Sequence, residues 1–407
     1  MAFDAPHIRR QFPFFTANDA LVWLDSAATA QKPETVLRAM DDFYRTTNAN
    51  VHRGMYEVAE RATAAYEGAR DTVKKFMNAR HSDEIIFTKS TTESLNLVAK
   101  SWGIAHLKKG DVIVLSILEH HSVIVPWLQM KEEAGITIEW IDCDDEGRLI
   151  MNDLKKALAG KNVKLVAVSG QSNVLGVRPP VTEIIRLAHQ SGALVCIDAA
   201  QLIAHHPVDV TALDCDFLAF SGHKLYGPTG IGVLYAKREI MQTMPPFLGG
   251  GSMIEEVRRD GFTPADPPHR FEAGTPPIAE AAGLTAAIDW LAQFPWKDIE
   301  EHEKNLMRAA FETLNDIEGL HILGPKNPDD ASACVSFVLK DLHPHDLADI
   351  LGQEGFCLRA GHHCAEPLHK RFSVPASLRL SVGIYTTEEE IRRLGPALKK
   401  AQKILAK

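Results

Sequence analysis

The chain lacks any long apolar stretch: no run in its 407 residues approaches the roughly 18 residues that span a bilayer. Its first ten residues also lack the apolar core of a signal peptide. Positive charge is not in excess, because 44 Lys and Arg residues stand against 53 Asp and Glu residues and leave a formal net charge of −9. These absences argue against a membrane span, a secretory leader and a nucleic-acid partner.

Cysteine is scarce, and no Cys-x-x-Cys pair occurs. The six cysteines lie in the last two thirds of the chain, at Cys143, Cys196, Cys215, Cys334, Cys357 and Cys364. In a chain of this length, such spacing is typical of reduced thiols and not of a disulfide framework or a zinc site. We therefore expect a cytoplasmic protein without a structural metal.

What the chain does contain is a regular alternation of strand-like and helical segments. Hydrophobic residues make up 45% of the sequence and charged residues 24%, which suits one large or two medium domains. The strand-like runs are 112–115, 136–141, 163–168, 193–197, 217–220 and 231–235. Helical patterns between most of them predict an α/β fold, with a mostly parallel sheet covered by helices on both faces.

The domain organisation is predicted from shifts in composition. An amphipathic arm, 1–20, is expected to pack with the smaller domain. A large domain follows over 21–294, and a smaller α+β domain over 295–407 carries the last cysteines. Within the large domain, residues 245–277 are rich in glycine and proline and are predicted to form a long functional loop.

One lysine, Lys224, stands among four glycines and a proline in the stretch 221–232, beside apolar strand-like runs. Small residues at such a turn let a bulky group approach the backbone closely. Asp198 ends an earlier apolar run. A lysine that forms a Schiff base and an acid that keeps a ring nitrogen protonated are the minimum of a pyridoxal-phosphate site. The alternative is an exposed turn lysine and a helix-capping aspartate.

Other polar residues also follow strand-like runs, as His120 and Asn173 do. Ligands of parallel sheets bind at the carboxyl ends of the strands, so these side chains are expected to meet Asp198 and Lys224 there. The stretch 90–93, Ser-Thr-Thr-Glu, follows the run 85–88 with the spacing of a capping box. A helix that begins there offers an anion site, and an ordinary helix cap is the alternative.

A second reactive group is Cys364, in the stretch Arg-Ala-Gly-His-His-Cys at 359–364. A nearby cation would favour its nucleophilic thiolate, and buried structure is the alternative. The paired histidines also allow a metal site, but no His-Glu-x-x-His motif accompanies them. Arg379 offers a planar fork for a substrate carboxylate.

These motifs together resemble one enzyme family. Ser-Gly-His-Lys at 221–224 resembles the fold-type I pyridoxal-phosphate enzymes of the class V aminotransferase group. The stretch 359–364 is similar to the signature of the group II cysteine desulfurases, the SufS/CsdA type, whereas group I enzymes place their cysteine in a longer, serine-rich loop. The likeness runs from Leu24-Asp25-Ser26-Ala27-Ala28 to Arg379, and only the Cys364 loop specifies the chemistry.

The resemblance implies pyridoxal 5′-phosphate as cofactor and a role for each matching residue. The implied catalytic residues are Lys224, Cys364 and His120, with the His120 ring stacked on the cofactor. The implied cofactor-binding residues are Thr92, His120, Asn173, Asp198, Gln201, Ser221, His223, Lys224 and Thr275. The implied substrate-binding residues are Arg379, Arg359, Asn173 and His52. Thr275 is expected to reach the phosphate of a partner subunit, which implies a homodimer with shared sites.

The activity implied is conversion of L-cysteine to L-alanine, with sulfur kept as a persulfide on Cys364. A SufE-like acceptor protein and iron–sulfur cluster assembly are the implied destination of the sulfur. A selenocysteine lyase or cysteine sulfinate desulfinase is the first alternative, because those reactions depend less on Cys364. An aminotransferase or a kynureninase-like hydrolase on the same scaffold needs no thiol. A non-catalytic scaffold that binds partners through 245–277 needs no cofactor.

Overall fold

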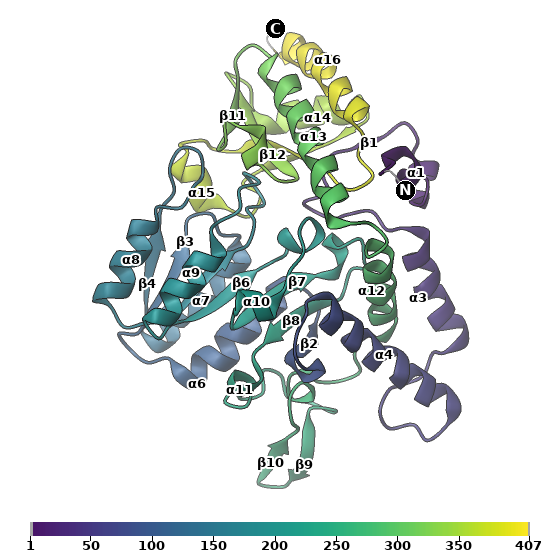
Figure 1. Ribbon diagram of the computed structural model, residues 1–407, viewed down its shortest axis with the longest axis vertical. Helices are drawn as coiled ribbons and strands as arrows, with labels where there is room; N and C mark the ends of the chain where they lie inside the picture. The colour runs from purple at the N-terminus through teal and green to yellow at the C-terminus, as the bar shows by residue number, and fades with distance from the viewer. Residues whose placement is uncertain (1–2, 406–407) are drawn as a thin grey trace.

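The computed structural model describes residues 3–405, and a seven-stranded sheet forms its centre (Figure 1). The strands are β2 (Ile85–Thr88), β3 (Val112–Ser116), β4 (Thr137–Ile141), β5 (Val163–Ser169), β6 (Leu194–Asp198), β7 (Phe217–Ser221) and β8 (Gly232–Ala236). Their order is β2-β8-β7-β6-β5-β3-β4, and only β8 among them runs against the others. The predicted α/β fold with a mostly parallel sheet is confirmed.

Both faces of this sheet are buried, which explains why its strands read as continuous apolar runs. In β3, Val112 and Val114 pack into one core cluster while Ile113 and Leu115 pack into another, because successive side chains point to opposite faces. The first cluster is covered by α3 (Glu34–Thr46), α4 (Glu57–Phe76), α8 (Met151–Gly160), α9 (Val181–Gln190) and α12 (Ile278–Leu291). The second is covered by α5 (Thr91–Leu97), α7 (His121–Ala134) and α11 (Arg238–Met241).

A smaller antiparallel sheet follows in the C-terminal part of the chain. Its strands, in spatial order, are β11 (Leu320–Leu323), β12 (Cys334–Leu339), β15 (Ser377–Ser381) and β14 (Arg359–Gly361). The helices beside it are α13 (Trp296–Asn315), α14 (Pro344–Gln353) and α16 (Glu388–Leu405). Leu306, Phe337 and Leu394 belong to the separate core cluster between these layers. The division into an arm, a large domain and a small domain stays a prediction.

The N-terminal segment contacts both parts of the molecule. Phe12, between α1 (Ala5–Arg9) and α2 (Pro13–Ala17), packs edge-to-face on Trp290 and Tyr385, with ring centroids 5.2 and 4.8 Å away. Arg9 forms an ion pair of 2.9 Å with Glu390 of α16. The short strand β1 (Val22–Trp23) pairs in parallel with β13 (Phe356–Cys357). The N-terminal segment thus packs against residues from the C-terminal part of the sequence.

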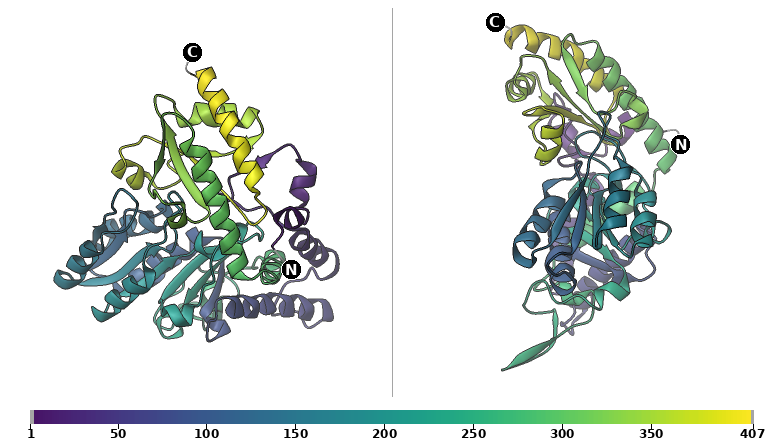
Figure 2. Two further views of the ribbon diagram at one scale, coloured as in Figure 1. Left: turned by 45° about the horizontal axis from the view of Figure 1, so that its top comes forward. Right: turned by 90° about the vertical axis from the view of Figure 1, so that its left-hand side faces the viewer.

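The prediction of a loop over 245–277 is wrong for its middle part. Strands β9 (Ile254–Arg258) and β10 (Gly261–Pro264) form an antiparallel hairpin that projects from the body of the molecule (Figure 2). Only Arg259 and Asp260 separate the paired ends, as in a two-residue hairpin turn. The glycine and proline content of the flanking segments hid this short pairing. Among all helices within residues 3–405, none combines the length and the apolarity that crossing a membrane requires.

Candidate active site

The carboxyl ends of β5, β6 and β7 meet at a cavity of about 200 Å³. The residues predicted for the site that line it are Thr92, His120, Asn173, Asp198, Gln201, Ser221, His223, Lys224, Arg359, Cys364 and Arg379. Parallel strands end at one edge of a sheet, so residues far apart in the sequence come together there. The small sheet contributes Arg359 and Arg379, and the cavity therefore lies between the two sheets.

Lys224 follows β7 in the short helix η4 (Gly222–Lys224), and Asp198 ends the neighbouring strand β6. Burial lowers the pKa of Lys224 to about 8, against the opposing effect of Asp198. Burial also raises the pKa of Asp198, which the amide N–H of Ala200 and the charge of Lys224 oppose. The Ala200 N–H donates to Asp198 Oδ1 over 2.8 Å, which fixes the carboxyl group. The amine is thus close to its nucleophilic, neutral form near pH 8.

The helix that begins at Thr91 supplies an anion site beside Ser221. Ser221 Oγ accepts the Thr91 N–H over 2.8 Å and lies 2.7 Å from Thr91 Oγ1. The predicted capping box is wrong: Ser90 makes no side-chain cap within the described residues, and Glu93 accepts the N–H of Lys89 instead of that of Ser90. The first-turn amides are therefore not occupied by the Ser90 side chain, and the helix dipole favours an anion there.

His120 forms the N-cap of α7 in a neutral state. Burial lowers its pKa to about 3, with a further contribution from the charge of Lys224. The Ser122 N–H donates to His120 Nδ1 over 3.1 Å, and the Ser122 hydroxyl lies 2.5 Å from the same nitrogen. An accepting Nδ1 leaves the ring proton on Nε2. His120 therefore presents a flat, neutral ring with one N–H donor at the cavity.

Two arginines on neighbouring strands form the positive end of the cavity. Arg379 is buried, and it donates from Nη1 to the Asn173 carbonyl over 2.9 Å and from Nη2 to Asp25 over 2.8 Å. Its Nε has no hydrogen-bond partner among residues 3–405. Arg359 lies opposite it in the β14–β15 register. This pair, with an unused buried donor, is suited to a carboxylate.

Cys364 enters the cavity on a loop whose backbone is strained. His363 and Cys364 have φ values of +50° and +58°, in the left-handed region. This conformation raises the free energy of a residue other than glycine by about 1–2 kcal/mol. The Asn173 amide donates to the His363 carbonyl over 2.7 Å. The His121 N–H donates to the Cys364 carbonyl, also over 2.7 Å. Contacts from the large-sheet part thus hold the half-buried thiol.

A chain of hydrogen bonds behind this loop defines the tautomer of His363. The Ala365 carbonyl lies 3.0 Å from His369 Nδ1 and must accept its proton, so His369 Nε2 is an acceptor for the Ser377 hydroxyl 2.9 Å away. Ser377 Oγ then accepts from His363 Nε2 over 3.1 Å. His363 Nδ1 remains an acceptor without a partner within residues 3–405. Burial lowers the pKa of His363 to about 2, which keeps the ring neutral.

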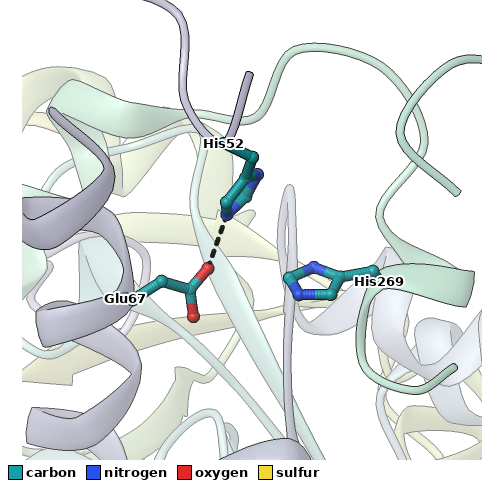
Figure 3. A group of neighbouring side chains, drawn as sticks. All are labelled: His52, Glu67 and His269. Carbon is teal, nitrogen blue, oxygen red and sulfur yellow. Dashed lines mark hydrogen bonds and ion pairs between the residues drawn. The ribbon is translucent and has the colours of Figure 1, made fainter. Parts of the chain in front are cut away.

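His52 and Thr275 are the two predicted site residues that do not line this cavity in the described chain. Thr275 lines a larger cavity of about 420 Å³ with several apolar side chains. His52 lies at a third cavity, where its Nε2 is 2.8 Å from Glu67 Oε1 and His269 faces the pair (Figure 3). A single chain therefore does not bring His52 to the substrate site predicted for it.

The ligand atoms of His52, Glu67 and His269 lie within 4.8 Å of one another. A tetrahedral zinc with bonds of ~2.1 Å would draw them to roughly 3.4 Å apart. Glu67 also accepts from Arg70 Nε over 2.9 Å, so a cation already occupies this carboxylate. The cluster is better described as a hydrogen-bonded pair beside a histidine than as a metal site.

Sequence reasoning missed residues that act behind the cavity. Asp25 forms an ion pair with Arg379. It stands in a stretch that matches the family, and an acidic residue in that stretch was the sequence feature that could have identified it. Glu119 precedes His120, and burial raises its pKa to about 7. Its Oε2 accepts from Ser169, which pairs with Asp198 between β5 and β6. No sequence signal marks Glu119, because its role depends on strand neighbours.

The cavity residues fit pyridoxal phosphate. A half-buried lysine with a lowered pKa suits a Schiff base, and the fixed carboxyl of Asp198 suits a protonated ring nitrogen. The helix start beside Ser221 suits a phosphate, and the neutral ring of His120 suits stacking. The unused donor of Arg379 suits the carboxylate of an amino acid.

Comparisons with known proteins agree with this chemistry. The Aminotransferase class-V family model matches residues 22–394. A probable cysteine desulfurase of Streptomyces coelicolor is 46% identical over 96% of this chain and 95% of that protein. The cysteine desulfurase of Haloferax volcanii is 44% identical over 95% of this chain and 90% of that protein.

Solved structures show the same likeness. The S-sulfonic acid form of the cysteine desulfurase CsdA from Escherichia coli has a TM-score of 0.92 at 40% identity and covers 99% of this chain and 100% of its own. The apo cysteine desulfurase of Thermococcus onnurineus has a TM-score of 0.94 at 41% identity with the same coverage. The chain therefore belongs to the class-V aminotransferase family and, within it, to the cysteine desulfurases, whose cofactor is pyridoxal phosphate.

Proposed function

We propose that this cysteine desulfurase converts L-cysteine to L-alanine by transfer of the substrate sulfur to Cys364. The observation that carries the proposal is that Lys224, Cys364 and Arg379 line one cavity, although Lys224 follows β7 of the large sheet and the other two belong to the C-terminal part of the chain. An amine, a thiol and a carboxylate fork are the groups that the reaction requires.

Each residue has a defined task in this proposal. Pyridoxal phosphate, when bound, withdraws electrons from the substrate carbons. Arg379 binds the α-carboxylate, and Asp198 holds a proton at the ring nitrogen. Lys224 Nζ, neutral near pH 8, takes the proton from the substrate Cα. Asp198 and Arg379 are buried, which keeps bulk water from these two groups.

Cys364 then acts as the nucleophile. Its thiolate forms an S–S bond with the substrate sulfur, the Cβ–S bond breaks, and the electron pair stays with the substrate carbon. The proton that the Cys364 thiol lost would be delivered to this carbon beside the His120 ring, Lys224 would return its proton to Cα, and L-alanine would leave. The sulfur remains as a persulfide on Cys364.

Replacement of Cys364 by alanine tests this assignment against the selenium and sulfinate alternatives. Alanine release from L-cysteine should be lost in the variant, whereas release from selenocysteine or cysteine sulfinate should continue, because those substrates carry a better leaving group. Undiminished turnover of L-cysteine would refute the persulfide. Formation of pyridoxamine phosphate with an α-keto acid would instead favour an aminotransferase.

The persulfide is proposed to pass its sulfur to a SufE-like acceptor protein and so to iron–sulfur cluster assembly in the cytoplasm. The support is that Cys364 is half-buried and that all six cysteines are free thiols. A carrier that inserts a thiol into the cavity should raise the rate of alanine formation above that with small thiols. A rate that does not respond to such a carrier would contradict the proposed acceptor.

We further propose a homodimer in which Thr275 of one subunit completes the site of the other. The support is that Thr275 lies away from the Lys224 cavity in its own chain, beside a cavity with apolar walls. Co-expression of a Lys224→Ala chain with a Thr275→Ala chain tests it. If Thr275 acts across the interface, the mixed dimer contains one intact site and regains activity. If it acts within its own chain, no activity returns.

A further inference from the structure

His121 contacts the Cys364 loop at two points, although the proposed reaction assigns it no task. It is the first residue of α7, directly after His120. Its backbone N–H donates to the Cys364 carbonyl over 2.7 Å. Its imidazole Nε2 accepts the N–H of Glu366 over 3.2 Å. Glu366 is the first residue of α15 (Glu366–Arg371), so His121 binds the peptide groups on both sides of Ala365.

The loop needs such contacts because its own hydrogen bonds are few. The Ala365 N–H donates to the His362 carbonyl over 2.8 Å, which closes a tight turn around the thiol. Two successive residues in the left-handed region, His363 and Cys364, make this turn unfavourable by itself. Strained backbone of this kind persists at functional sites only when surrounding groups hold it. The side chain of His121 is one of the groups that do so.

We propose that His121 is a positioning residue for Cys364: its imidazole fixes the start of α15 and thereby the direction of the thiol, so that sulfur capture requires it while thiol-independent reactions of the same site do not. This inference rests on the role of Cys364 proposed above. It adds a residue at the start of α7, outside the cavity lining, that selects between two reaction classes.

The protonation state of the imidazole decides whether the contact exists. Nε2 must be unprotonated to accept the Glu366 N–H, so the neutral ring carries its proton on Nδ1. Burial lowers the pKa of His121, which the charge of Glu366 opposes and that of His362 assists. His120 is the neighbouring titratable group on its own element, and burial keeps it neutral. Protonation of His121 would place its Nε2–H against the N–H of Glu366, so that the hydrogen bond between them would be lost.

Two variants at one position test the inference. In His121→Phe the ring plane remains and the acceptor is lost, whereas in His121→Gln a side-chain oxygen can accept from Glu366. The backbone bond to Cys364 remains in both. We expect His121→Phe to lower alanine release from L-cysteine roughly 5-fold, the effect of one lost hydrogen bond, and to leave alanine release from cysteine sulfinate unchanged. His121→Gln should restore most of the rate with L-cysteine.

His106→Phe is the matched control, because His106 is an exposed histidine outside the cavity lining, and its side chain hydrogen-bonds to the carbonyl of Trp102 in the preceding turn. Cofactor absorption reports whether each variant folds and loads. In the wild type, turnover of L-cysteine should fall at acid pH as His121 is protonated. Because Lys224 also gains a proton as pH falls, the readout is the ratio of L-cysteine turnover to cysteine sulfinate turnover. This ratio should fall at acid pH in the wild type and stay constant in His121→Gln, which a merely structural role would not produce.

Two results would overturn the inference: an equal loss with both substrates in His121→Phe, or no loss with L-cysteine. A failure of the proposed function is distinguishable, because Cys364→Ala would then still convert L-cysteine at the full rate. Alkylation of Cys364 by iodoacetamide, followed by peptide mass spectrometry, gives a readout independent of turnover. A freed loop should react faster in His121→Phe than in His106→Phe, and equal alkylation rates would also overturn the inference.

Discussion

Lys224 and Cys364 line the same cavity, but the protein positions them in different ways. Lys224 lies in η4, just after β7, a strand whose residues are all buried. Cys364 lies on a strained loop outside the regular elements, and Asn173 and His121 hold it from the other part of the molecule. The sheet therefore fixes the amine, whereas a few hydrogen bonds between the two parts fix the thiol.

The difference separates two kinds of failure. Damage at the sheet edge should remove cofactor chemistry altogether, because the residues that fit the ring and the phosphate lie there. Damage at the loop should leave cofactor chemistry intact and remove sulfur capture alone. Substitutions at the sheet edge and in the loop show whether these two kinds of failure are independent.

Lys224→Ala should have the largest effect. Loss of the amine should abolish the visible absorption of the Schiff base and lower alanine release by about 10³-fold or more. Absorption spectra and an alanine assay measure both results. Lys161→Ala, at a lysine whose side chain is 41% exposed, serves as the control. A Lys224→Ala protein with unchanged absorption would contradict the assignment of the sheet edge.

Cys364→Ala should separate the two regions. Alanine release from L-cysteine should fall by about 10²-fold, since the nucleophile is gone, while the Schiff-base absorption stays as in the wild type. Cys357→Ala is the matched control. Cys357 is also half-buried, but it lies on β13, where it pairs with Trp23 of β1, and it is not part of the cavity lining. Loss of cofactor absorption in Cys364→Ala would mean that the two regions are not independent.

Arg379→Lys should affect the substrate more than the cofactor. The lysine keeps the charge but not the planar fork, so KM for L-cysteine should rise about 10-fold with a smaller change in kcat. Steady-state kinetics measure this. Arg308→Lys changes an exposed arginine paired with Asp329 and should leave KM unchanged. A lower kcat with an unchanged KM would argue against carboxylate binding by Arg379.

Cofactor loading by the apoprotein should follow the pKa of Lys224, which burial lowers to about 8. The neutral amine is the reactive form and increases as pH rises, so the loading rate should grow about tenfold per pH unit below pH 8 and level off above it. Stopped-flow absorption measures the rate. A rate that keeps growing toward the ordinary lysine pKa of about 10.4 would show that Lys224 is not desolvated.

The sequence predicted the sheet edge because the alternation of strand-like and helical runs indicates mostly parallel strands, although the order of the strands does not follow from it. His120, Asn173, Asp198 and Lys224 each follow an apolar run, and parallel strands bring such positions together. The class of the fold was predictable for the same reason. The resemblance to a family supplied the role of Cys364, which no spacing could indicate.

The remaining features depend on contacts between distant segments. One such contact joins Arg379 to Asp25, near the two ends of the chain. Another joins Asn173 to His363, between the two parts of the molecule. Local sequence patterns do not indicate either pair. The hairpin β9–β10 was missed because few residues form it. The predicted capping box is wrong by one residue: Glu93 accepts the N–H of Lys89 and not that of Ser90. Ser221 Oγ accepts the N–H of Thr91, the first residue of the helix.

Mass spectrometry of the Cys364 peptide after treatment with L-cysteine, without an acceptor or a reductant, tests the central claim most directly. We expect this peptide to gain the mass of one sulfur atom while an equivalent amount of L-alanine is released, and the other five cysteines to remain unmodified. Alanine release without added sulfur on Cys364, or with the sulfur on another cysteine, would contradict it.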